Sequence, residues 1–175
     1  MYSQGSTLNL LNFSSVKNVA TQNGGSIYLD KYCTLFIKRS ILMLNSANYS
    51  GGSIYLNRYN TLHLSHNLFK NNSASFSNGG SIYISSYNSY VVSEFNRFVH
   101  NTATVGRGGA IYFDTYNRYF SSFRDDFFQN SALSYGGALY MNSYNEFGLI
   151  KYSTFTRNFF KLKSFDFFGE LMLDI

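Results

Sequence analysis

Short stretches in which every second residue is apolar recur along the chain, the first beginning at residue 27. A period of two places alternate side chains on one face of a β-strand. The pairs predicted to face inward are Ile27 and Leu29, Ile54 and Leu56, Ile82 and Ile84, Ile111 and Phe113, and Leu139 and Met141. No stretch sustains a 3.6-residue period, so the pattern predicts strands without crossover helices.

A second alternating stretch follows four of these five strands after a short turn. Its predicted inward pairs are Leu35 and Ile37, Leu62 and Leu64, Tyr90 and Val92, and Phe147 and Leu149. A motif Phe-x-x-Asn then closes each unit, and its first residue is Phe69, Phe98, Phe127 or Phe155, with Leu42 in the earliest copy. One unit therefore contains two strands, a turn between them and a closing turn.

A glycine pair precedes each first strand. Its first member is Gly24, Gly51, Gly79, Gly108 or Gly136, which gives spacings of 27, 28, 29 and 28 residues. A tyrosine follows eight residues after each of these glycines, and an asparagine comes next in four copies, with Cys33 in the first. A regular period of this length is typical of a solenoid in which each repeat forms one coil.

The landmarks together predict an all-β fold, a single-stranded parallel β-helix of about five coils of 27–29 residues, with incomplete coils at both ends. We expect residues 1–17 to form a partial N-terminal coil and residues 18–158 to form five coils. Residues 159–175 are expected to form a degenerate coil or tail, in which residues 168–174 align with the first strand of the other units.

Equivalent residues of successive coils lie above one another in such a stack, so the tyrosine between each inward pair falls on the outer face. These residues are Tyr28, Tyr55, Tyr83, Tyr112 and Tyr140, and we take them as a candidate ligand-stacking ladder. The asparagines of the turns are expected to adopt left-handed backbone angles and to pass amide hydrogen bonds between coils.

Composition agrees with short strands. The chain is 45% hydrophobic, 19% aromatic and 13% charged, against roughly 25% charged in an average domain. Proline, which would interrupt a parallel ladder, is absent. The net charge is +5, but the basic residues are scattered, so we expect no nucleic-acid partner. No apolar run is long enough to predict a membrane span, and residues 1–11 lack the order of a signal peptide.

Acidic residues do not form the close pair that glycoside hydrolysis needs. Asp125 and Asp126 are adjacent, so their side chains are expected on opposite faces of a strand. Asp30 and Asp114 would lie three coils apart, at about 14 Å. We therefore predict no catalytic residues and no enzyme activity.

The histidines and the cysteine do not predict a metal or cofactor site. His63 and His66 are three residues apart, a spacing that places them on opposite faces of a strand. His100 lies within a Phe-x-x-Asn turn, and Cys33 replaces a turn asparagine. We expect no metal, no cofactor and no residues that bind one.

The glycine and phenylalanine motifs resemble a known repeat. Gly-Gly-Ala-Ile at residues 108–111 and Gly-Gly-Ala-Leu at residues 136–139, combined with Phe-x-x-Asn, resemble the polymorphic outer-membrane protein repeat typified by chlamydial surface proteins. Ser26, Ser53 and Ser81 replace the alanine in the other copies. The resemblance implies a right-handed parallel β-helix displayed at the cell surface or secreted, and we expect the chain to be a fragment or a divergent copy.

The sequence thus predicts a non-catalytic structural or adhesin-like segment of a cell-surface or secreted repeat protein. Its expected partners are host or surface glycans or proteins, or further β-helix coils of a longer chain. Two alternatives stay open. One is a carbohydrate-active enzyme of the polysaccharide lyase or hydrolase type, since β-helices also host these pectin lyase-like enzymes; the other is a glycan-binding module that uses the outer tyrosine ladder.

Overall fold

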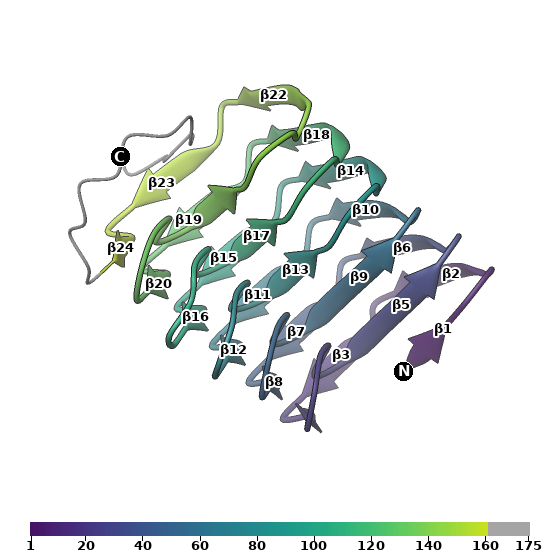
Figure 1. Ribbon diagram of the computed structural model, residues 1–175, viewed down its shortest axis with the longest axis horizontal. Helices are drawn as coiled ribbons and strands as arrows, with labels where there is room; N and C mark the ends of the chain where they lie inside the picture. The colour runs from purple at the N-terminus through teal and green to yellow at the C-terminus, as the bar shows by residue number, and fades with distance from the viewer. Residues whose placement is uncertain (161–175) are drawn as a thin grey trace.

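The computed structural model describes residues 1–160 as a stack of parallel strands that contains no helix. Every coil contributes one strand to each of four sheets, and the strands of each sheet lie side by side along the stack (Figure 1). The all-β solenoid predicted from the repeat is confirmed. It has about six coils, because β1 (Tyr2–Ser3) pairs with β5 (Ile27–Lys31) and gives the first coil a strand in the first sheet. The predicted strand at residues 168–174 lies outside the described residues.

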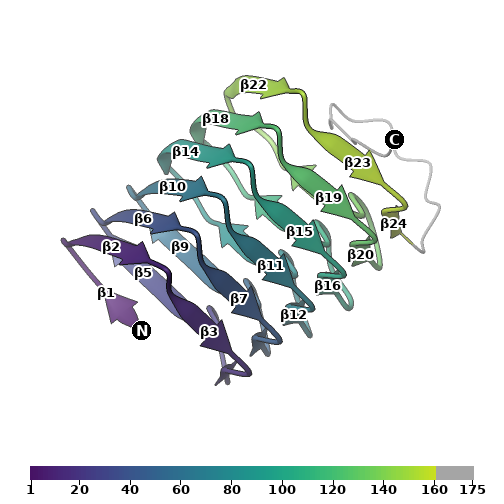
Figure 2. The ribbon, with the colours of Figure 1, turned by 180° about the vertical axis from the view of Figure 1, so that it is seen from behind.

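The four sheets occupy successive sides of the stack, as Figures 1 and 2 show from opposite directions. The first sheet consists of β1, β5, β9 (Ile54–Arg58), β13 (Ile82–Ile84), β17 (Ile111–Phe113) and β21 (Leu139–Met141). The second consists of β2 (Thr7–Leu11), β6 (Thr34–Lys38), β10 (Thr61–Ser65), β14 (Ser89–Glu94), β18 (Arg118–Phe123) and β22 (Phe147–Lys151). The third consists of β3 (Ser14–Val16), β7 (Ile41–Met43), β11 (Leu68–Lys70), β15 (Arg97–Val99), β19 (Asp126–Phe128) and β23 (Thr154–Thr156). The fourth consists of β4 (Val19–Ala20), β8 (Ser46–Ala47), β12 (Ser73–Ala74), β16 (Thr102–Ala103), β20 (Ser131–Ala132) and β24 (Phe159–Phe160).

The interior is a continuous column of apolar side chains. All ten inward residues predicted in the first sheet are at most 4% exposed. The phenylalanines of the Phe-x-x-Asn motif stack inside the third sheet, with 4.8 Å between the ring centroids of Phe69 and Phe98 and again between those of Phe98 and Phe127. Burying each such side chain contributes about 1.5–3 kcal/mol, so the column is the main source of cohesion between the sheets.

The inward pair predicted for β14 is wrong. Val91 and Ser93 are buried there and pair with Leu62 and Leu64 of β10, whereas Tyr90 is 55% exposed. The extra residue lies within β14: the buried Val91 follows Asn88 by three positions, whereas Leu62 of β10 follows Asn60 by two. The added residue is Tyr90, which takes a left-handed backbone angle, with φ of 54°. Because strand side chains alternate, one extra residue moves the whole strand by one position and reverses its faces.

The inward position predicted at Leu149 of β22 is also wrong. Leu149 is 58% exposed, and its neighbour Ile150 packs against the core instead. The pairing of β22 with β18 shifts register at Gly148, which has no partner residue in β18. The extra glycine forms a bulge, and the residues after it exchange faces for the same reason as in β14.

The glycine pair before each first strand is required by backbone packing between coils. The first glycine of the pair has a left-handed backbone, with φ of 69° at Gly79. The second has another coil directly against it: a Cβ atom on Gly80 would collide with the carbonyl oxygen of Gly109 and with the backbone of Thr102. Since neither of these backbone groups can rotate away, any side chain at Gly80 forces the coils apart.

Replacing Gly80 with alanine is therefore expected to lower the free energy of unfolding by about 3 kcal/mol, measured by chemical denaturation. Gly5→Ala is the matched control, because its Cβ would have no atom within 4 Å although its φ is +60°. The control should lose only about 1 kcal/mol from backbone strain. Equal losses in the two variants would show that the collision between coils is not what the glycine pair avoids.

Candidate functional site

The turn after each first-sheet strand places a tyrosine outside the coil and an asparagine inside it. The tyrosine takes the left-handed conformation, with φ between 57° and 60° at Tyr32, Tyr59, Tyr87, Tyr116 and Tyr144. The following asparagines, Asn60, Asn88, Asn117 and Asn145, are not left-handed, so the prediction that they adopt such angles is wrong at this turn. The tyrosine makes the bend, and the next side chain consequently turns into the protein.

These inward asparagines join successive coils. The backbone N–H of Asn60 donates to Oδ1 of Asn88, and the backbone N–H of Asn88 donates to Oδ1 of Asn117, both at 2.9 Å. The Nδ2 of Asn88 donates back to the carbonyl of Asn57 at 3.0 Å. Cys33, 2% exposed, takes this position in its coil, and its N–H donates to Oδ1 of Asn60. The predicted passage of amide hydrogen bonds between coils is confirmed.

The asparagines of the Phe-x-x-Asn motif form a second ladder, which is buried from Asn45 to Asn130. Its members are Asn18, Asn45, Asn72, Asn101, Asn130 and Asn158. Asn101 accepts from both the N–H and the Nδ2 of Asn72 at 3.0 Å, and it donates to the carbonyl of Phe69. Within residues 1–160 no buried side-chain polar atom lacks a hydrogen-bond partner, so burying these amides leaves none of their side-chain polar groups unsatisfied.

A third ladder contains the carboxyl group of Asp125, and the sequence analysis did not find it. Its middle members are Asn67, Asn96 and Asp125, and the N–H of each donates to the side chain in the next coil, ending on Ser153 Oγ. The sequence does carry a signal for this ladder, because a polar residue recurs every 27–29 positions, at Ser40, Asn67, Asn96 and Asp125. These residues stand two positions before the Phe of Phe-x-x-Asn, where no motif drew attention to them.

Asp125 is 1% exposed and accepts hydrogen bonds from three groups. Oδ1 accepts from the N–H and the Nδ2 of Asn96 at 2.7 and 3.1 Å, and Oδ2 accepts from Ser122 Oγ at 2.6 Å. Burial raises the pKa of the Asp125 carboxyl, and these hydrogen bonds oppose the shift without cancelling it. Asp126 lies outside, 3.3 Å from Arg97, so the two carboxyls share no site.

Asp30 and Asp114 lie on the outer face of the first sheet in different coils, and hydrogen bonds to neighbouring coils occupy them. Tyr83 donates to Asp114 Oδ2 at 3.2 Å, and Asn57 donates to Asp30 Oδ1 at 2.8 Å. Burial raises the pKa of the Tyr83 hydroxyl, which keeps it protonated and able to donate. The carboxylates thus tie adjacent coils together.

The candidate stacking ladder forms, but its rings cover one another. Centroids of successive rings from Tyr28 to Tyr140 are 5.0–5.3 Å apart, with interplanar angles of 14° or less. Tyr112 and Tyr140 are 4% and 0% exposed, and the guanidinium of Arg107 lies over the Tyr140 ring. Because neighbouring tyrosines occupy both faces of the middle rings, a sugar cannot lie flat against them.

The histidines lie against aromatic rings. His63 stacks on Phe36 and His66 on Phe95, with centroids 4.6 and 4.7 Å apart, and His100 meets Phe128 edge-on. Partial burial lowers the pKa of the His63 imidazole. No group of three His, Cys, Asp or Glu side chains suited to a metal ion occurs in residues 1–160.

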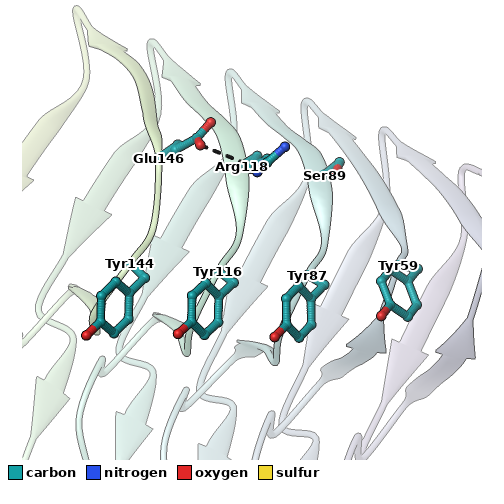
Figure 3. A pocket seen from close by; sticks show the side chains of 7 residues that line it. All are labelled: Tyr59, Tyr87, Ser89, Tyr116, Arg118, Tyr144 and Glu146. Carbon is teal, nitrogen blue, oxygen red and sulfur yellow. Dashed lines mark ion pairs between the residues drawn. The ribbon is translucent and has the colours of Figure 1, made fainter.

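A groove lies beside a second, more exposed tyrosine ladder. The corner residues Tyr59, Tyr87, Tyr116 and Tyr144 form one side, and Ser89, Arg118 and Glu146 form the other, as two parallel rows (Figure 3). Ring centroids along the ladder are 4.9–5.8 Å apart. The sequence analysis used these tyrosines only as spacing landmarks. That they face solvent depended on the left-handed turn, which the spacing alone did not reveal.

Comparisons of the chain with models of protein families, with curated proteins and with solved structures gave no match. Over residues 1–160, no helix is present that could cross a bilayer.

Replacing Asn101 with alanine is expected to destabilise the protein by about 3 kcal/mol, because the N–H and Nδ2 of Asn72 and the carbonyl of Phe69 lose their partner inside the core. Chemical denaturation measures the change. Asn142→Ala serves as control, since this partly exposed amide donates to Asp114 at 3.2 Å and should cost less than about 1 kcal/mol. A loss below that of the control would contradict a cohesive role for the ladder.

Replacing Asp125 with asparagine should stabilise the protein at pH 8 by about 1 kcal/mol. The new amide can make contacts equivalent to those of the Asn96 amide, which donates to Ser93 Oγ in its own coil and to the carbonyl of Leu64 in the preceding coil. The raised pKa means that the folded protein holds the Asp125 proton more tightly than the unfolded chain. This carboxyl therefore favours folding below its ordinary pKa of 3.8, and that contribution is lost as the pH rises through the raised value.

The gain from Asp125→Asn should accordingly shrink between pH 8 and pH 4, as measured by denaturation at both values. Asp126→Asn is the matched control from the adjacent, solvent-facing position and should change stability by less than about 0.5 kcal/mol at either pH. A gain from Asp125→Asn that stays the same at both pH values would rule out the buried carboxylate as its cause.

Proposed function

We propose that this chain is a non-catalytic, adhesin-like β-helix segment of a cell-surface or secreted repeat protein. The observation that carries the proposal is the exposed tyrosine at the same corner of five successive coils, from Tyr32 to Tyr144, with exposures between 44% and 72%. Tyrosine is enriched where proteins bind partners, because it offers a large apolar surface with a polar end. A row of such residues suits attachment along an extended ligand.

The polar interior supports a structural role for the rest of the molecule. Its buried amides and the Asp125 carboxyl hydrogen-bond to neighbouring coils, so they hold the stack together. Solenoids of this kind present extended surfaces in place of one deep pocket. The proposed partners are accordingly host or surface glycans or proteins, or further β-helix coils.

The proposed location at the cell surface or outside the cell is based on a sequence resemblance. The Gly-Gly-Ala motifs at residues 108–111 and 136–139, and the related motifs of the other coils, resemble the polymorphic outer-membrane protein repeat. The exposed tyrosines place apolar surface on the outside of the stack, as at sites where proteins bind partners. The resemblance and the exposed row thus support the same function.

A carbohydrate-active enzyme is a second candidate because Arg118 and Glu146 line the groove beside the tyrosines. Glycoside hydrolysis usually needs two carboxyl groups, and within residues 1–160 Glu146 is the one acidic residue that lines this groove. The groove therefore favours binding over hydrolysis.

The proposal predicts saturable binding without turnover. Beads coated with the full chain should adhere to an array of glycans and extracellular-matrix proteins, and beads coated with a denatured sample should not. The same protein, incubated with a panel of polysaccharides, should release neither reducing ends nor unsaturated sugars. Failure to bind any component of the array would sink the adhesive function, and product release abolished by Glu146→Gln would establish the enzyme instead.

A further inference from the structure

We propose that the groove along the corner tyrosines binds a linear, uncharged polysaccharide whose chain runs along the axis of the stack. This inference rests on the proposed adhesive function and names its ligand class. The groove has a volume of about 360 Å³, within the roughly 300–1,000 Å³ typical of ligand sites. It is built from equivalent residues of four successive coils, Tyr59, Tyr87, Tyr116 and Tyr144 (Figure 3).

The repeat of the groove indicates a polymeric ligand. Each coil presents the same tyrosine, with 5.8, 5.2 and 4.9 Å between successive ring centroids from Tyr59 to Tyr144. An extended β-1,4-linked glycan advances by a closely similar distance per sugar. One sugar can therefore meet one coil, and because successive β-1,4-linked sugars alternate in orientation, equivalent contacts recur at every second coil.

The chemistry of the two rows suits sugar hydroxyl groups and C–H surfaces. Tyr87 and Tyr116 are 45% and 44% exposed, so part of each ring and its hydroxyl faces solvent. Ser89 and Arg118 are paired residues of neighbouring strands and lie opposite, where Arg118 can donate to a sugar oxygen. Apolar ring edges on one side and hydrogen-bonding groups on the other are what an amphipathic sugar ring requires.

The charge balance of the groove favours an uncharged ligand. Among the described residues that line it, the one cation, Arg118, lies 3.5 Å from the one anion, Glu146, and both side chains are more than half exposed. The pair leaves no net positive charge to attract a sulfated or uronic acid chain or a nucleic acid. An uncharged sugar can accept from the guanidinium and donate to the carboxylate without separating charges.

The other tyrosines of the described coils provide a control for this site. Tyr90 and Tyr119 belong to the same two coils as Tyr87 and Tyr116, and they are 55% and 51% exposed. They stack at 5.0 Å and have the same left-handed backbone, yet they do not line the groove. Removing them alters exposed aromatic area and backbone strain equally, but leaves the proposed site intact.

Calorimetric titration of the full chain with hexaoses of β-1,4-linked glucose, N-acetylglucosamine or mannose tests the inference. At least one hexaose should bind. Tyr87→Ala/Tyr116→Ala should weaken its binding about tenfold or more, and Tyr90→Ala/Tyr119→Ala should change it less than about twofold. Arg118→Gln, which leaves the rings in place, should also weaken binding. This variant tests the site even if circular dichroism shows that the double variant does not fold.

Three results would overturn the inference. Retention of full affinity by Tyr87→Ala/Tyr116→Ala and by Arg118→Gln would place the ligand elsewhere. Binding of a heparin hexasaccharide in preference to all three neutral hexaoses would refute the uncharged ligand class, as would no binding of any neutral hexaose. Each of these results leaves the adhesive function standing if the coated beads still bind matrix proteins or other glycans on the array.

Discussion

Parallel strands that pair in register from coil to coil require each residue to lie above a chemically equivalent one, and the other features of this protein depend on that constraint. In the interior, apolar residues mostly lie above apolar ones: Phe98 pairs with Phe69 and Phe127, and Phe113 pairs with Ile84. At the inner corners, an amide lies above an amide and can be both donor and acceptor to its neighbours. Asparagine meets this need because its side chain carries a donor and an acceptor at once.

The same register determines the exterior. Any outward residue that is repeated becomes a row along the stack, and two such rows of tyrosine differ only in their surroundings. The row from Tyr28 to Tyr140 lies on the strands of the first sheet, and Arg107 and Tyr135 lie against its last ring. The row from Tyr32 to Tyr144 lies at a corner and stays exposed beside a groove. A construction rule that serves stability thus also generates a repeated surface suited to binding.

Asp125 shows what happens when one member of a row changes. It occupies the position of Asn67 and Asn96 and accepts their type of hydrogen bond, but it has no amide N–H to donate to the preceding coil. Ser122 compensates by donating to the second carboxyl oxygen. The position accommodates a carboxyl only because a hydroxyl from the same coil lies within reach, and burial still raises its pKa.

Repeat spacing and strand alternation were enough to predict the parallel solenoid, the inward residues of the first sheet and the amide hydrogen bonds between coils, because these depend on period alone. The faces of β14 and β22 were not predictable in this way, since one added residue at Tyr90 or Gly148 reverses a strand without disturbing the spacing of the landmarks. Nor could the pattern distinguish the largely buried tyrosines of the strand row from the exposed tyrosines that border the groove. Exposure there depends on which corner residue takes the left-handed angle and on which side chains, such as Arg107, lie over the strand row, and only the folded coils decide both.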